Sequence, residues 1–182
     1  MTMKPWTPAA FRLALVCAAS GFAGLALAQS PDRVAAHTDW SVFVAGSPKE
    51  CYIVSPPKSS AATRDGKPAE VQRGDIRLFV AFRPGENVAN EVSFTGGYPF
   101  REGSTVTLAV GSDSFTLTPG SDDGAGEWAW TDPADDAEVV AALKRGATAT
   151  LTGTSSRGTQ TADTFSLSGF TAAVEDAAAR CR

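Results

Sequence analysis

The chain has 182 residues, with 20 acidic side chains against 16 lysines and arginines and a formal net charge of −4. Basic residues are interleaved with acidic ones and form no run, which argues against nucleic acid and anionic membrane surfaces as partners. The length suits one domain with a hydrophobic core rather than two.

The first 28 residues have the features of an export signal. Lys4 and Arg12 precede an apolar run over residues 13–27, and small residues form an A-x-A cleavage site that ends at Ala28. The alternative is an uncleaved membrane anchor, but the apolar run is shorter than the about 20 residues that a bilayer span needs. We therefore expect cleavage after Ala28, a periplasmic location and no membrane span after cleavage.

Three cysteines are present, and Cys17 lies inside the expected signal. The other two, Cys51 and Cys181, belong to a chain exported to an oxidising compartment, where an even number of thiols is most simply paired. We predict a structural Cys51–Cys181 disulfide that holds the last helix, with Phe170 and Val174 packed beneath that helix as an i, i+4 pair.

The mature chain is expected to begin with a flexible tail over residues 29–38, which are polar and alanine-rich and show no apolar alternation. A single domain should follow over residues 39–182. Its β-favouring runs are short and bounded by turn residues. They lie at residues 40–44, 52–54, 76–82, 88–95, 105–110, 114–118, 127–131, 147–152 and 164–167. Within residues 76–82, we expect the even-numbered side chains to face the core.

Two helices are indicated. Asp132 is a suitable N-cap, and Gly146 can take the left-handed conformation that stops a helix, so one internal helix should lie between them. A short C-terminal helix over residues 172–180 should lead to Cys181. About nine short strands with two helices predict a mainly β fold, a two-sheet antiparallel β-sandwich or a barrel-like arrangement.

Patterns that support catalysis are weak. His37, the one histidine, falls in the expected tail and is a poor base for a catalytic triad. Ser55 and Lys58 match S-x-x-K, but Pro56 and Pro57 between them prevent the helical turn that this pair needs. We expect no catalytic residues and no enzymatic activity.

Four carboxylates fall in or beside a glycine-rich stretch: Asp113, Asp122, Asp123 and Glu127. Carboxylate oxygens are ligands for calcium. Aspartates in such turns also stabilise the turn itself by side-chain to backbone bonds, and their order here does not match the helix-loop-helix calcium pattern. We favour turns, and expect no metal and no cofactor.

The candidate binding residues are aromatic. Trp128 and Trp130 lie two positions apart on one strand, so their indoles share a face. They either stack against a sugar or a peptide or fill the core. Tyr98, in a Gly-Gly-Tyr-Pro turn, is either a ligand-facing tip or part of the turn. A glycan- or peptide-binding β-sandwich that uses these three residues is one hypothesis, and the exposure of the two tryptophans would favour it.

Several stretches, taken in order, resemble the invasion-associated locus B proteins of Gram-negative bacteria. They are D-W-S-V at 39–42, C-Y-I at 51–53, V-S-F-T-G-G-Y-P at 92–99, G-T at 158–159 and D-T-F-S-L-S-G-F-T-A-A at 163–173. The resemblance implies a periplasmic or envelope-associated, β-rich protein. Founding members are linked to entry into host cells, and the family pattern contains no catalytic residues.

Many members of that family carry an additional cysteine soon after the tryptophan, where this chain has Phe43, Val44 and Ala45.

The resemblance leads us to expect a non-enzymatic interaction or envelope-support module. Its expected partner is an envelope protein, a host-surface protein or a glycan.

Overall fold

The structure is a computed structural model that describes residues 30–121 and 125–182, so the predicted export signal lies outside the described residues. The described chain forms twelve strands, two α-helices and two short 3-10 helices. In chain order these are β1 (Asp32–His37), β2 (Trp40–Ala45), β3 (Glu50–Ser55), β4 (Ser59–Arg64), β5 (Lys67–Pro68), β6 (Arg77–Arg83), η1 (Pro84–Glu86), β7 (Val88–Thr95), β8 (Val106–Val110), β9 (Asp113–Pro119), η2 (Ala125–Glu127), β10 (Trp128–Thr131), α1 (Asp136–Arg145), β11 (Thr148–Thr154), β12 (Gln160–Ser166) and α2 (Phe170–Arg180). Neither α-helix in this part of the chain is long and apolar enough to cross a membrane.

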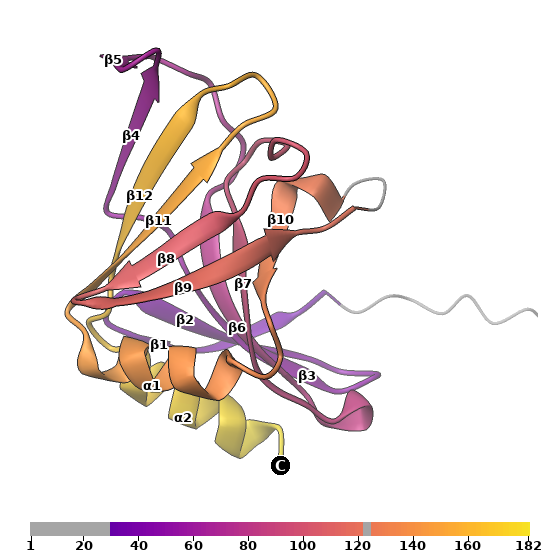
Figure 1. Cartoon of the computed structure of the whole chain (residues 1–182). Helices are drawn as coiled ribbons and strands as arrows, with labels where there is room; N and C mark the ends of the chain where they lie inside the picture. The colour runs from indigo at the N-terminus through magenta and orange to yellow at the C-terminus, as the bar shows by residue number, and fades with distance from the viewer. Residues whose placement is uncertain (1–29, 122–124) are drawn as a thin grey trace, which may run out of the picture.

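The strands form one antiparallel sheet in the order β1-β2-β3-β6-β7-β10-β9-β8-β11-β12-β4-β5. β10 pairs with β7 on one side and with β9 on the other. It therefore joins the strands β1, β2, β3, β6 and β7 to the strands β9, β8, β11, β12, β4 and β5 by backbone hydrogen bonds, whereas a sandwich would have two sheets that are not hydrogen-bonded to each other. The sheet ends at β1 and β5 and is not closed into a barrel. The mainly β prediction is confirmed, whereas the two-sheet division is not: one curled sheet takes its place (Figure 1).

The curl follows from the link between β3 and β4. These strands are consecutive in the chain but occupy the third and eleventh places in the sheet, and residues 56–58 alone join them. The two halves of the sheet must therefore approach each other here. Lys58 N donates to Thr164 O at 2.7 Å, and Trp40 Nε1 donates to Ser166 O at 3.0 Å, so the end of β12 lies beside the start of β2.

The hydrophobic core lies between the inner face of the curled sheet and the two helices, which lie together against one end of the sheet (Figure 1). Leu78, Val80 and Phe82 are buried, which confirms the even-numbered core face predicted for this strand. Phe170 and Val174 are buried beneath α2 as expected.

A disulfide joins Cys51 in β3 to Cys181 after α2, with the Cα atoms 5.8 Å apart. This separation lies within the range that a disulfide requires. The predicted pairing is confirmed, and it fastens the last helix to the third strand of the sheet.

The predicted tail is corrected by β1. Residues 32–37 form an edge strand along β2 instead of a flexible segment. The sequence of β1 shows no apolar alternation because most of its side chains are exposed. Backbone pairing with β2 holds this edge strand in place. At its end, His37 Nε2 lies 3.0 Å from Asp176 Oδ2 of α2, so the folded domain begins before residue 39.

The predicted start of the internal helix is corrected. Its predicted end at Gly146 is confirmed in position but not in conformation. Asp132 Oδ1 accepts a hydrogen bond from Ala134 N at 2.9 Å in a turn, and the helix begins only at Asp136. Gly146 is extended, with φ of −80° and ψ of 161°, rather than left-handed. A Cβ at Gly146 would lie 2.4 Å from Val110 Cγ1, so this position needs glycine for packing rather than for conformation.

Candidate functional site

Five aromatic side chains lie next to one another on the outer face of the sheet, which is the face opposite the core. We call them the aromatic row: Phe43 of β2, Tyr52 of β3, Phe79 of β6, and Trp128 and Trp130 of β10. Neighbouring ring centroids are 5.1, 6.0, 5.2 and 6.4 Å apart in that order. All five side chains are partly exposed, because they alternate along their strands with residues that point into the core.

Small residues on β7 allow the row to cross the sheet. β7 lies between β6 and β10, and its Ser93 pairs with both Phe79 and Trp130. Thr95 pairs with Trp128 in the same way. Ser93 and Thr95 are buried, so the larger rings of the flanking strands meet over them. Such cross-strand aromatic contacts also stabilise the outer face.

The row borders a shallow hollow of about 340 Å³ that also has polar groups along it. Arg83 forms ion pairs with Glu91 at 2.6 Å, with Glu86 at 2.9 Å and with Glu50 at 3.5 Å. The hydrogen bond to Glu91 is the main reason that the pKa of Arg83 is raised. Burial, together with the charge of Glu50, raises the pKa of Tyr52, so its hydroxyl stays protonated. The hollow thus combines ring surfaces with hydrogen-bonding groups of both kinds.

Tyr98 lies apart from the two tryptophans. Its hydroxyl is 2.6 Å from Thr161 Oγ1, and its ring packs edge-on against Phe100 at a centroid distance of 5.1 Å. The Arg73 guanidinium lies 5.0 Å from the ring centroid. Burial raises the pKa of Tyr98. Of the three predicted site residues, the structure therefore brings Trp128 and Trp130 together and places Tyr98 in a different hollow.

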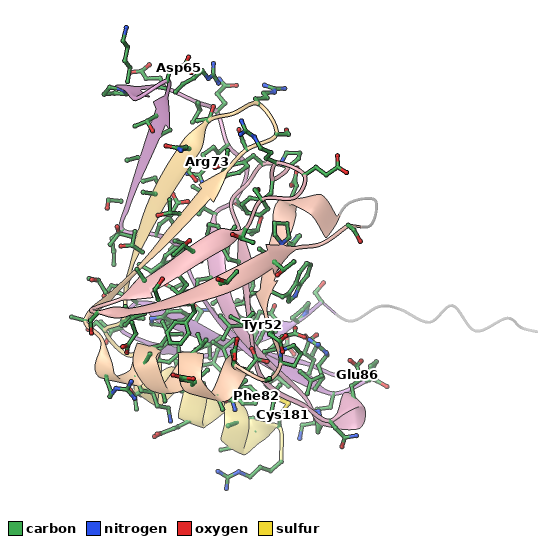
Figure 2. The ribbon with its side chains drawn as sticks, viewed as in Figure 1. Tyr52, Asp65, Arg73, Phe82, Glu86 and Cys181 are labelled. Atoms are coloured by element: carbon green, nitrogen blue, oxygen red, sulfur yellow. A yellow bond between two sulfur atoms is a disulfide. The ribbon has the colours of Figure 1, made fainter. Side chains whose placement is uncertain are left out.

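That second hollow, which we call the mouth pocket, has a volume of about 550 Å³. It lies at the end of the curled sheet far from the helices. Figure 2 shows this separation, with Arg73 of the pocket near the top of the view and Cys181 beside the helices near the bottom. Most of its wall comes from residues 70–73 before β6, the turn at residues 97–99, and the hairpin between β11 and β12. Arg64 of β4 and Glu127 of η2 complete the wall.

A buried ion pair supports the mouth pocket. Arg73 Nη1 and Nη2 donate to the two carboxylate oxygens of Asp163 at 2.8 and 2.6 Å, and Arg73 Nε donates to Gly96 O at 2.8 Å. Asp163 is fully buried. This bidentate geometry ties the segment before β6, which is neither helix nor strand, to β12.

Within the described part of the chain, the contacts of the other residues singled out in the sequence do not bring a nucleophile and a base together. Ser55 Oγ donates to Asp39 O at 2.8 Å, and Lys58 forms an ion pair with the Asp39 carboxylate. Asp113 forms an ion pair with Arg145 at 3.4 Å. Glu127 lines the mouth pocket.

Asp122 and Asp123 lie outside the described residues. Across residues 30–121 and 125–182, no three histidine, cysteine, aspartate or glutamate side chains gather in a way that could hold a metal ion.

Sequence reasoning missed three members of the row, namely Phe43, Tyr52 and Phe79. A signal was present for Phe79, since the alternation that assigned even-numbered residues to the core placed this ring on the opposite face. The residues that support the mouth pocket carried no such signal, because Arg73 and Asp163 are far apart in the sequence.

Comparisons with known proteins agree with this fold. The family model for the invasion associated locus B (IalB) protein matches residues 67–178. The crystal structure of invasion associated protein B from Bartonella henselae aligns with a TM-score of 0.53 and 18% sequence identity, covering 84% of this chain and 98% of that chain. A likeness at this identity shows a shared fold. The comparison with curated proteins finds no match. Since the family model spans more than half of the residues, the chain belongs to the invasion associated locus B (IalB) protein family.

Proposed function

We propose that this chain is a non-enzymatic interaction module of the periplasm or cell envelope that binds glycan chains through the aromatic row. The single observation that carries the proposal is the row itself. Five partly exposed rings lie side by side on the outer face of the sheet, and large apolar groups gathered on a surface mark interaction sites.

A glycan fits the chemistry of the row. A sugar ring has apolar C–H faces and hydroxyl edges, so it needs ring surfaces flanked by hydrogen-bonding groups. Tyr52, Phe79 and Trp130 supply the ring surfaces around the hollow. Arg83 and Glu91 lie beside them and hydrogen-bond to each other, and the carboxylate oxygens of Glu91 keep further lone pairs that can accept from a hydroxyl.

An envelope location is supported by the predicted export signal and by the disulfide, because such bonds form and persist in oxidising compartments. The proposal of a non-enzymatic role is supported by where the candidate catalytic groups lie. Ser55 and Lys58 each contact Asp39, and His37 contacts Asp176, so these contacts build no nucleophile with an adjacent base.

The test is calorimetric titration of the disulfide-bonded mature chain with β-linked oligomers of glucose and of N-acetylglucosamine. We expect one of these to bind, and we expect Trp130→Ala and Phe79→Ala each to lower the affinity at least tenfold. The matched control is Tyr98→Phe, which keeps its ring and lies in the mouth pocket, and which should bind as the unchanged chain does. Unfolding in urea should show that all variants are folded.

A peptide is the rival ligand, since proline-rich segments dock in aromatic-lined grooves. A proline-rich decapeptide is therefore titrated in parallel. Binding of this peptide in place of both glycans, or glycan binding that survives Trp130→Ala and Phe79→Ala unchanged, would overturn the proposal.

A further inference from the structure

The mouth pocket is a second site, separate from the aromatic row. We propose that it binds an acidic sugar unit, with Arg64 and Arg157 as the side chains that hold the carboxylate. This inference does not rest on the row or on the function proposed for it. The pocket volume of about 550 Å³ lies within the range of small-molecule sites.

The first argument is charge. Arg73, at the base of the pocket, is neutralised by Asp163. Within the described chain, Arg64 and Arg157 on the pocket wall form no ion pair. Arginines that do form ion pairs there are Arg73, Arg77, Arg83, Arg145 and Arg180. Arg64 and Arg157 therefore offer two guanidinium groups without ion-pair partners on a wall that also holds Glu70 and Glu127, and paired N–H donors of this kind match the geometry of a single carboxylate.

The second argument is that Arg64 is held in place before any ligand arrives. Its Nε and Nη2 donate to Thr159 Oγ1 at 3.3 and 2.7 Å. Thr159 is itself buried, and its N–H donates to Ser155 Oγ at 3.1 Å. The Nη1 group of Arg64 makes neither of these bonds, so its donors remain to bind a carboxylate.

The remaining lining identifies the rest of the ligand. Glu70 and Glu127 lie on the pocket wall, and their oxygens can accept hydrogen bonds from hydroxyls while repelling a second anionic group. Tyr98 and Pro99 add an apolar side. A ligand with one carboxylate, several hydroxyls and an apolar ring face satisfies these groups together, and a sugar acid has this chemistry.

The experiment is calorimetric titration of the disulfide-bonded mature chain with D-glucuronate, D-glucose and D-glucose 6-phosphate. We expect glucuronate to bind at least tenfold more tightly than glucose. The double variant Arg64→Gln, Arg157→Gln should weaken glucuronate binding at least tenfold. The matched control is Arg33→Gln, which removes an exposed arginine from β1 and should leave the affinity unchanged.

A second measurement follows the Nε–H signal of Arg64 by NMR, which should shift when glucuronate is added and stay in place when glucose is added. Trp130→Ala should bind glucuronate as the unchanged chain does, which separates this site from the row. The proposal is overturned by equal glucuronate binding to the double variant, by glucose binding as tightly as glucuronate, by tighter binding of glucose 6-phosphate, or by no glucuronate binding.

Discussion

Gly169 lies directly against the backbone of His37, so that a Cβ at Gly169 would stand 2.0 Å from the His37 carbonyl oxygen. Gly169 also has a φ of +87°, in the left-handed region. The glycine in the D-T-F-S-L-S-G-F stretch is therefore required for two independent reasons, its backbone conformation and its close contact with β1. It begins α2 in a conformation that other residues adopt at a cost, and it lets α2 approach β1.

Gly169→Ala should lower the free energy of unfolding by more than about 2 kcal/mol, the combined cost of a left-handed non-glycine residue and of moving β1 away. Urea unfolding followed by circular dichroism measures this change. Gly66→Ala is the matched control, since Gly66 has a φ of +74° but open space around it. That variant should lose only about 1 kcal/mol, and equal losses in the two variants would contradict the packing argument.

The Arg73–Asp163 pair should be among the most sensitive contacts in the molecule. Both side chains are almost fully buried, with 8% and 0% exposed. Asp163→Asn keeps the shape but leaves the guanidinium without its counter-charge, which should cost about 3–5 kcal/mol in the free energy of unfolding. Asp75→Asn is the comparison, because the Asp75 side chain is 85% exposed beside Arg77. Its effect should stay within about 0.5 kcal/mol, and a similar loss in both variants would argue against burial as the cause.

Local patterns predicted the strands that have one buried face. The alternation in residues 76–82 gave the core side of β6 correctly, because Leu78 and Val80 pack inward while Phe79 does not. The β-favouring runs at residues 105–110 and 114–118 were also predicted, and they form the paired strands β8 and β9. In these cases the period of the side chains carries the information.

Features that depend on contacts distant in sequence could not be predicted in this way. β1 follows from pairing with β2 and from the fit of His37 against Gly169, neither of which leaves an apolar pattern in residues 29–38. The single curled sheet depends on the pairing of β10 with both β7 and β9, and the alternation of apolar and polar residues along a strand does not specify its partners. The mouth pocket requires Arg73 to reach Asp163, and a local motif cannot show that pairing.

The Cys51–Cys181 bond should contribute strongly to stability, because it closes a loop with a sequence separation of 130. By the loop-entropy estimate, its loss should lower the free energy of unfolding by up to about 4–5 kcal/mol. Urea unfolding with and without a reductant measures this loss. The control is the double variant Cys51→Ala, Cys181→Ala, whose unfolding midpoint should not respond to the reductant. An identical midpoint for oxidised and reduced unchanged protein would refute the prediction.

Asp136 should make the stability depend on pH in an unusual direction. Its carboxylate is buried at the start of α1 and accepts hydrogen bonds from Thr131 Oγ1 and from Val92 N. Burial raises the pKa of Asp136 by more than these hydrogen bonds lower it. The folded protein therefore holds this proton more tightly than the unfolded chain does, so ionisation of Asp136 opposes folding. Its stabilising contribution is fully present below the pKa of the unfolded chain, about 3.9, and is lost as the pH rises through the folded-state pKa.

Asp136→Asn cannot ionise but keeps an oxygen that can accept the hydrogen bonds from Thr131 and Val92. The free energy of unfolding of this variant, relative to the unchanged protein, should therefore increase as the pH is raised from about 4 to 7, while effects of the other carboxylates cancel in the comparison. Urea unfolding at several pH values measures the difference, and Asp135→Asn controls for losing an exposed charge beside the same helix start. A difference between Asp136→Asn and the unchanged protein that stays constant over this range, or that falls as the pH rises, would show that burial does not govern this carboxylate.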